Sequence, residues 1–258
     1  MTAVALVTGA AGGMGRAIVR RLAQDGFSVV AVDLGEAPLR ALADELAGEG
    51  LEIQPRVVDL TSEAQLVELV DGLPPLAALV NSAGLFDERK YFDLGQDDFR
   101  RMYELNLIAA ATLTQRAAAR MAPGSKVVNI ASRAYLGARH HAHYVASKAA
   151  LVGYTRASAM ELAEKGILVN AIAPGLIDTP MLRALTPERM AAQLALQPTG
   201  RAGTPEEIAH AVSFLAGPQM GFITGQVLFV CGGTSVGFVS PEGREIKHKF
   251  ASGYPTGS

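Results

Sequence analysis

A hydroxyl, a phenol and an amine stand within one short stretch of this chain and could together transfer a proton. Ser132 follows an apolar run over residues 126–131 that is typical of a buried strand, and Tyr144 and Lys148 follow four residues apart on a helical pattern. Side chains four apart share one face of a helix, so the phenol and the ammonium can converge on one point. Ser132 can reach that point from the strand end.

The chemistry that this set favours is general acid/base catalysis by the phenol. The pKa of a free tyrosine is about 10, so the phenolate is scarce at neutral pH. A nearby ammonium favours the phenolate, and so does the positive end of a helix. Lowering the pKa of Tyr144 to about 7 needs roughly 4 kcal/mol, which Lys148, the helix end and a cationic cofactor could supply between them.

A glycine-rich segment near residue 1 predicts a phosphate-binding turn. Residues 4–8 have the pattern of a short strand and residues 16–25 that of an amphipathic helix. Between them lies the sequence TGAAGGMG, which contains Gly9, Gly12, Gly13, Met14 and Gly15. Glycines let the backbone approach a pyrophosphate, and the helix N-terminus directs N–H groups at it. Glycines that serve only packing are the alternative, but the strand and helix flanks favour a dinucleotide site.

Asp33 follows the next expected strand, over residues 28–32, and predicts a preference for NAD over NADP. A carboxylate at this place can accept hydrogen bonds from both ribose hydroxyls and repels a 2′-phosphate. No Arg or Lys lies among residues 10–14 or at Leu34 and Gly35 to receive such a phosphate. The alternative is a carboxylate that only caps a helix or a turn.

Alternating strands and helices predict the rest of the fold. Further strands are expected over residues 53–58, 76–80, 166–172 and 226–230, and helices over residues 39–47, 97–121, 144–164 and 205–215. This alternation is typical of an α/β protein with a Rossmann-type, doubly wound parallel sheet and helices on both faces. Asp59 and Leu60 follow the third strand, where the carboxylate either meets an adenine edge or caps a loop. Asn81, Ala83 and Gly84 follow the fourth, where small side chains leave room for a ligand.

The ordered set of motifs resembles the short-chain dehydrogenase/reductase family, in its single-domain branch. The match runs from near residue 1 to about residue 236 and comprises the glycine-rich turn, the segment 81–84, Asn106, Ser132, Tyr144, Lys148, Pro174 and Gly175. The resemblance implies that Tyr144 is the acid/base and that Ser132 bonds the substrate oxygen. It implies that Lys148 lowers the pKa of the tyrosine and holds the nicotinamide ribose.

The resemblance assigns further residues to the same site. Asn106 is implied to position a water in a proton relay, whereas the residues alone allow a hydrogen-bonded core asparagine that locally kinks its helix. Pro174, Gly175, Ile177 and Thr179 are implied to turn over the cofactor, with Ile177 and Thr179 on the nicotinamide carboxamide. A simple helix cap is the alternative for Thr179.

The resemblance also implies the division of the chain. We expect one NAD-binding domain over residues 1–238, including a substrate lid over about residues 179–203, and a C-terminal extension over residues 239–258. Apolar lid residues would exclude water from the hydride step, although a packed surface helix is the alternative for each of them. They are Met181, Leu182, Leu185 and Met190.

The loop before Tyr144 is rich in basic side chains. They are Arg133, Arg139, His140, His141 and His143. The HHxH spacing allows a metal site, but a second ligand cluster is lacking, so no metal is expected. A solvated turn is one further interpretation, and a cationic edge that faces an acidic substrate is the other.

Composition excludes several classes of function. The 258 residues, 49% hydrophobic and 19% charged, fit one large globular α/β domain. The net charge of -2 gives no basic surface for nucleic acid or an anionic membrane. The single cysteine, Cys231, favours a reducing compartment. We see neither a leader nor an apolar run long enough to cross a bilayer, so a cytoplasmic protein is expected.

Together these features predict an NAD-dependent oxidoreductase that interconverts a secondary alcohol and its ketone. A cyclic, aromatic or hydroxy-acid alcohol is the first substrate class. A 3-oxoacyl-thioester (acyl-carrier-protein) reductase is the enzymatic alternative, and a non-catalytic NAD-binding or redox-sensing protein is the alternative from another class. Small residues along the helix over residues 144–164, with the resemblance, imply a homotetramer or a homodimer.

Overall fold

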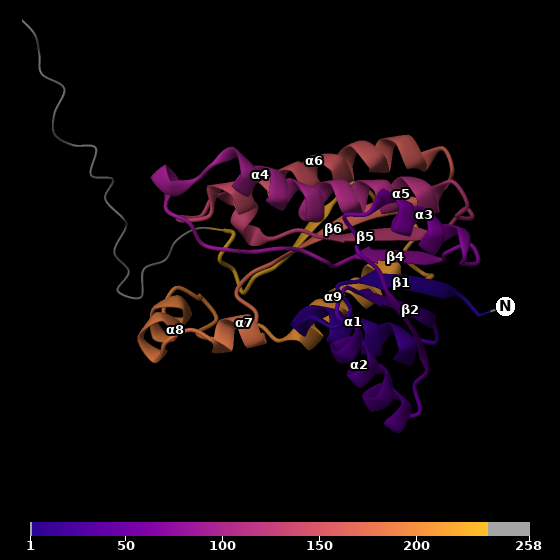
Figure 1. Cartoon of the computed structure of the whole chain (residues 1–258), viewed down its shortest axis with the longest axis horizontal. Helices are drawn as coiled ribbons and strands as arrows, with labels where there is room; N and C mark the ends of the chain where they lie inside the picture. Colours follow the sequence, from indigo (N-terminus) through magenta and orange to yellow (C-terminus); the bar gives the residue numbers. More distant parts are fainter. Residues whose placement is uncertain (1, 237–258) are drawn as a thin grey trace, which may run out of the picture.

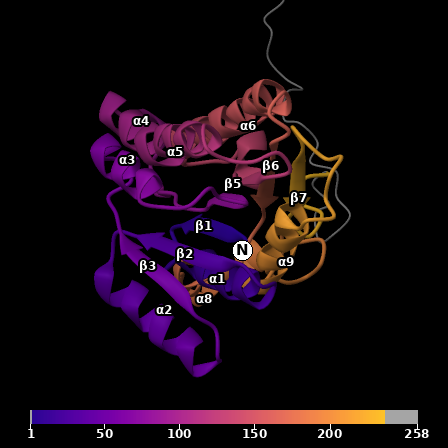
Figure 2. The same ribbon diagram turned by 90° about the vertical axis from the view of Figure 1, so that its right-hand side faces the viewer.

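The computed structural model describes residues 2–236, which form a parallel seven-stranded sheet with helices on both faces (Figures 1 and 2). The strand order is β3-β2-β1-β4-β5-β6-β7. The strands are β1 (Val4–Thr8), β2 (Ser28–Asp33), β3 (Ile53–Val57), β4 (Ala78–Asn81), β5 (Lys126–Ile130), β6 (Leu168–Pro174) and β7 (Val227–Val230). The expected α/β, Rossmann-type doubly wound sheet is confirmed.

Two groups of helices cover the two faces of the sheet. The α-helices are α1 (Gly13–Gln24), α2 (Glu36–Gly48), α3 (Glu63–Asp71), α4 (Gln96–Tyr103), α5 (Ala109–Ala118), α6 (Ala142–Ala163), α7 (Pro180–Arg183), α8 (Pro187–Leu194) and α9 (Pro205–Ala216). In Figure 1, α3 to α6 lie on one side of the sheet, and α1, α2 and α9 lie on the other.

The central strands are apolar along their whole length because both of their faces are buried. Leu6 and Val30 point to one face and join the core beneath α3 and α5, whereas their neighbours Val7 and Ala31 point to the other and join the core with α1, α2 and α9. This alternation follows from the two-residue period of a strand. The sheet, buried on both faces, therefore holds the residues at its edge in fixed positions.

The expected helix over residues 97–121 is wrong in one respect, because it is not continuous. α4 ends at Tyr103, a π-helical turn, η2, spans Glu104–Ile108, and α5 follows, ending at Ala118. Asn106 lies within η2 and is 1% exposed. Such single-turn widenings of a helix occur frequently at functional sites.

The carboxyl ends of all the strands meet at one edge of the sheet, because every pairing is parallel. The ends of β1 to β6 and the segments that follow them at this edge include most of the predicted site residues. The strand order reverses between β1 and β4, and sheets of this class bind ligands at such a point. α7 and α8 project past this edge, away from the N-terminus (Figure 1).

Candidate active site

Ser132, Tyr144 and Lys148 come together at the carboxyl edge of the sheet. Ser132 follows β5, and the other two lie on the first turns of α6. The Nζ atom of Lys148 is 5.9 Å from the centre of the Tyr144 ring. The Ser132 hydroxyl lies close enough to Tyr144 to influence its ionisation. It also accepts a hydrogen bond from the Ala134 N–H at 3.1 Å, which fixes the Ser132 side chain.

Lys148 is a buried cation held by one backbone carbonyl. Its side chain is 4% exposed, and Nζ donates to the Ile130 oxygen at 2.8 Å. Burial lowers the pKa of Lys148 to about 8, because the charged form loses hydration. Gly84 makes room for this ammonium, since a Cβ at Gly84 would lie 3.2 Å from Nζ.

The prediction that Lys148 lowers the pKa of Tyr144 is not met by the protein alone. Burial raises the pKa of Tyr144 above its ordinary value, and the Ser132 hydroxyl opposes this rise only in part. The physical reason is that the partly buried phenolate would lose hydration, while Lys148 is bonded to Ile130 instead. A cationic cofactor beside the ring would add positive charge and favour the phenolate.

Asn106 uses both the oxygen and the nitrogen of its amide to hold the segment that leaves β4. Its Oδ1 accepts from the Leu85 N–H at 2.7 Å, and its Nδ2 donates to the Leu85 carbonyl at 3.0 Å. Nδ2 also donates to Ser147 Oγ at 2.9 Å, and Ser147 donates to the Tyr144 carbonyl at 2.8 Å. The π-helical turn therefore carries an amide that joins the β4 loop to α6.

The glycine-rich turn packs directly against the segment after β4. Gly9 has a φ of +65°, and a Cβ there would lie 2.7 Å from the Ala83 Cα. A Cβ at Gly15 would lie 2.0 Å from the Gly9 carbonyl oxygen. Thr8 Oγ1 accepts from the N–H groups of Ser82 and Ala83, both at 3.1 Å. Only glycine fits these two positions, which explains two of the predicted glycines.

Asp33 has three backbone partners at the end of β2. Its Oδ2 accepts from the Ala11 N–H at 2.9 Å, and its Oδ1 accepts from the N–H groups of Leu34 at 2.8 Å and Gly35 at 3.3 Å. Asp33 therefore caps the turn, as the alternative interpretation predicted. A carboxylate oxygen accepts more than one hydrogen bond, so these partners do not preclude a ribose.

The site fits a dinucleotide. No side chain caps the N-terminus of α1, and the first turn of this helix has no acidic residue. The helix therefore offers N–H groups and a positive dipole end to a pyrophosphate, beside a turn that glycines keep narrow. Gly12 is the N-cap, and Gly13 and Met14 begin the helix. A Cβ at Gly13 would lie 2.9 Å from Thr179, which brings the β6 loop over the turn.

β6 continues to Pro174, beyond the expected end of the strand, and Asp59 caps the loop after β3. Pro174 ends β6, and the next residue, Gly175, donates its N–H to Val230 at 2.9 Å. Thr179 occupies the N-cap position of α7 without capping it through its side chain. Asp59 accepts from both the N–H and the hydroxyl of Thr61, at 2.9 and 2.7 Å. Its loop-capping interpretation is thus observed.

The basic side chains of the loop before α6 differ in their exposure. Arg139 and His140 are exposed. Burial lowers the pKa of His141, so that ring is neutral near pH 7. Among residues 2–236, no three His, Cys, Asp or Glu side chains gather closely enough to hold a metal ion.

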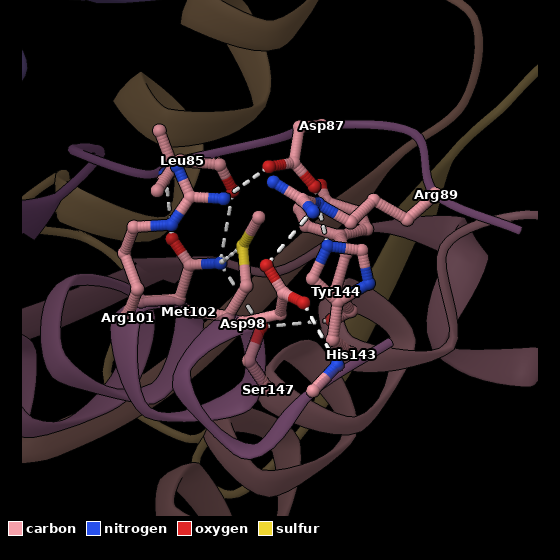
Figure 3. A network of polar contacts seen from close by, with 11 residues as sticks. Leu85, Asp87, Arg89, Asp98, Arg101, Met102, His143, Tyr144 and Ser147 are labelled. Atoms are coloured by element: carbon pink, nitrogen blue, oxygen red, sulfur yellow. Dashed lines mark hydrogen bonds and ion pairs between the residues drawn. The ribbon is translucent and has the colours of Figure 1, made fainter. Parts of the chain in front are cut away.

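Phe86, Asp87 and His143 are site residues that the sequence did not single out together. The Phe86 ring meets the Tyr144 ring edge-on, with centroids 5.0 Å apart. His143, next to Tyr144 in the chain, is 0% exposed and hydrogen-bonds to Asp87, which also pairs with Arg101 (Figure 3). No local pattern indicates a contact between residues 56 positions apart.

An open hollow of about 680 Å³, lined by residues 213–214 and 217–223, lies apart from the site and contains none of the site residues described above.

No helix within the described residues is long and apolar enough to cross a membrane.

Comparison with known sequences gives consistent matches along almost the whole chain. A family model described as enoyl-(acyl carrier protein) reductase matches residues 9–235. The (2S)-((R)-hydroxy(phenyl)methyl)succinyl-CoA dehydrogenase subunit BbsD of Thauera aromatica is 39% identical over 239 residues, covering 90% of this chain and 96% of that protein. The 3-oxoacyl-(acyl-carrier-protein) reductase FabG of Escherichia coli (strain K12) is 36% identical over 235 residues, covering 89% and 96%.

Solved structures match the fold equally well. A blue fluorescent protein from a metagenomic library, in complex with NADPH, is similar with a TM-score of 0.84 and 36% identity, covering 90% of this chain and 98% of that one. A variant of actinorhodin polyketide ketoreductase with NADPH has a TM-score of 0.85 and 35% identity, covering 91% and 97%. Both of these neighbours carry a nicotinamide cofactor.

Proposed function

Because the chain belongs to the short-chain dehydrogenase/reductase family, we propose that it is an NAD-dependent oxidoreductase that interconverts a secondary alcohol and its ketone. One observation carries the proposal. Ser132, Tyr144 and Lys148 gather beside a glycine-rich turn and the carboxylate of Asp33, at the edge where β1 and β4 meet. A proton-transfer group thus lies next to a site that fits a dinucleotide.

When bound, the nicotinamide ring supplies the hydride acceptor, or the donor in reverse. Tyr144 takes the proton of the substrate hydroxyl at its phenolic oxygen. Ser132 donates a hydrogen bond to the substrate oxygen and stabilises its developing charge. Lys148 contributes positive charge and binds the ribose, and Asn106 orders a water for the proton relay. The adjoining glycine turn, with the segments 59–60, 81–84 and 174–179, binds the rest of the cofactor.

The preference for NAD rests on Asp33. Its carboxylate faces the turn and would repel a 2′-phosphate. Two similar solved structures contain NADPH, so a preference for NAD would distinguish this protein from them. Measuring kcat/KM with NAD and with NADP decides it, and a clear preference for NADP would contradict it.

The first substrate class is a cyclic, aromatic or hydroxy-acid alcohol. The relative from Thauera aromatica is named for an aromatic hydroxyacyl thioester, which supports this class. The FabG relatives support a second candidate, 3-oxoacyl-thioester reduction. Turnover of acyl-carrier-protein thioesters with NADPH, faster than any alcohol oxidation with NAD, would favour the second candidate.

We also propose that the protein is a cytoplasmic homotetramer or homodimer that associates through α6. Ala149, Gly153 and Ala157 form an exposed stripe of small residues on this helix, and a Cβ at Gly153 would meet no other atom within 4 Å. Light scattering tests this, and a monomer would contradict it. Residues 1–238 form the proposed domain, and residues 239–258 lie outside the described residues.

The lid over residues 179–203 forms part of the same proposal. Leu182 is buried and Met181 is exposed, so the two do not share one role. Leu185 and Met190 are half-buried. Ile177 pairs with Gly203 across the base of the segment, and Arg189 of α8 pairs with Glu88 at 2.8 Å. The lid is thereby attached to the loop that follows β4.

A screen of secondary alcohols with NAD, followed by NADH absorbance, tests the function most directly. We expect turnover of at least one aromatic or hydroxy-acid alcohol and none by a Tyr144→Phe variant. Tight NADH binding without turnover of any alcohol or 3-oxoacyl thioester would favour the non-catalytic alternative.

A further inference from the structure

Four consecutive residues of the segment after β4 meet the site one after another. A Cβ at Gly84 would lie 3.2 Å from both Lys148 Nζ and Asn106 Oδ1. The backbone of Leu85 is bonded on both sides by Asn106. The ring of the next residue, Phe86, meets Tyr144 edge-on with centroids 5.0 Å apart. This segment, residues 84–87, therefore lies along the whole polar cluster.

The far end of the segment is fixed by an ionisable pair whose histidine is buried. Asp87 hydrogen-bonds to His143, and the same carboxylate pairs with Arg101 of α4. His143 is 0% exposed, whereas the Asp87 side chain keeps 28% of its surface exposed. Burial acts to raise the pKa of the Asp87 carboxyl, but the bonds from His143 and Arg101 bring it below its ordinary value. The carboxylate thus stays charged at neutral pH.

Two neighbouring residues of α6 contact two neighbouring residues of the segment. His143 precedes Tyr144 on α6, and Asp87 follows Phe86 in the segment, so the polar pair lies beside the aromatic pair. Figure 3 shows Asp87 between Arg101 and His143, with Tyr144 beside His143. Beyond this point the Arg89 N–H donates to the His140 carbonyl at 2.6 Å, which joins the same two stretches again.

We propose that Asp87 and His143 are positioning residues that hold Phe86 against the Tyr144 ring and so direct the phenolic hydroxyl toward the substrate oxygen. The proposal rests on the acid/base role proposed for Tyr144. Without the His143 donor, the Asp87 side chain keeps, among the described residues, its ion pair with the exposed Arg101, and the segment loses its polar side-chain contact with α6 beside the reacting group. A misplacement of about 1 Å in such a group can lower the rate on the order of 100-fold.

The test compares two substitutions of one residue with a matched control. His143→Phe keeps a planar ring but removes the donor, and His143→Gln keeps a side-chain N–H. Thr155→Val is the control, because Thr155 is also 0% exposed on α6 and accepts a buried hydrogen bond, from Asn129 at 2.9 Å. We measure kcat, the KM for the cofactor, the urea midpoint, and the ionisation of Tyr144 by ultraviolet difference titration against Tyr144→Phe.

We expect His143→Phe to lower kcat about 10- to 100-fold, to leave the cofactor KM nearly unchanged and to shift the Tyr144 titration. His143→Gln restores most of the kcat, and Thr155→Val lowers the urea midpoint without a comparable loss of kcat. If His143→Phe does not fold, Asp87→Leu removes the acceptor instead, and Asp87→Asn, which keeps an oxygen for the His143 donor, is its control. Parental kcat and titration in the folded variants would overturn the inference, and so would a loss of kcat that His143→Gln does not restore.

The same measurements separate this inference from the proposed function. A Tyr144→Phe variant as active as the parent would refute the acid/base role itself. An inactive Tyr144→Phe together with a fully active His143→Phe would refute only the positioning role.

Discussion

Asp33 and Ala11 are joined by a hydrogen bond of 2.9 Å from the backbone N–H to the carboxylate. The residue proposed to select the cofactor therefore also fixes the glycine-rich turn that binds it. Cofactor preference and the stability of the turn depend on the same side chain, and substitutions can separate the two contributions.

Asp33→Asn keeps an oxygen acceptor for the Ala11 N–H but removes the charge. We expect the ratio of kcat/KM for NADP to that for NAD to rise about tenfold or more, with little change in the free energy of unfolding. Asp33→Ala also leaves the N–H without its partner, so unfolding should become easier by about 1–3 kcal/mol. Cofactor kinetics and urea denaturation measure the two effects. An unchanged cofactor ratio in Asp33→Asn would contradict the role of the charge.

Tyr144→Phe removes the hydroxyl proposed to exchange the substrate proton. We expect kcat to fall by about 10²–10⁴ while the Kd for NADH, measured by fluorescence, changes little. Tyr154→Phe is the matched control, because Tyr154 also lies on α6 and its hydroxyl donates to the Ala111 carbonyl at 3.2 Å. Its kcat should stay near that of the parent. Equal losses in the two variants would show that general disturbance of α6 is responsible.

Lys148 should make the stability of the protein depend on alkaline pH. Its pKa is about 8 when folded, against an ordinary value of 10.5, so between these values the unfolded chain binds the extra proton. Below pH 8 the cost of burying the charge is fully present, and it disappears as the pH rises to 10.5. The unfolding free energy of the parent, minus that of Lys148→Met, should therefore increase by about 3 kcal/mol over this range.

Urea denaturation at several pH values measures this difference, and titrating groups remote from Lys148 cancel in it. A difference that stays constant from pH 7.5 to 10.5 would mean that Lys148 keeps an ordinary pKa in the folded protein.

Asn106→Ala leaves the Leu85 N–H and carbonyl without their partners. We expect a loss of about 1–3 kcal/mol in unfolding free energy and a fall in kcat, because the β4 loop is released beside Tyr144. Asn170→Ala is the control, since Asn170 bonds a remote backbone in the same manner, to Ile223 at 2.7 Å and Gln226 at 3.0 Å. For Asn170→Ala we expect a similar loss of unfolding free energy but a kcat close to that of the parent. A parental kcat in Asn106→Ala would exclude this residue from the reaction.

Much of the architecture could be predicted from the sequence because its signals are local. Apolar runs marked the strands, and parallel order placed their following residues at one edge. The glycine turn was equally clear, since a positive φ at Gly9 and the contact of Gly15 with its carbonyl admit no side chain. These constraints act within a few residues of the chain.

The remaining features depend on contacts between distant segments. The helix over residues 97–121 has an unbroken pattern in which Asn106 allowed a local kink. The bonds from Asn106 to Leu85 that accompany the π-helical turn join residues 21 positions apart, which the pattern does not reveal. The direction of the Tyr144 pKa depends on burial, which spacing on a helix does not reveal. The pairing of Asp87 with His143 has no periodic signal in the sequence.

The π-helical turn at Glu104–Ile108 marks the place where this helix can change its length. A π-helical turn holds one residue more than an α-helical turn, so deletion of one residue here would relax the turn into an ordinary helix while α4 and α5 keep their relative orientation. Deletion of one residue within α4 or α5 would instead rotate the side chains beyond it by about 100°. Among homologous chains, a gap of one residue in this helix should therefore fall within residues 104–108.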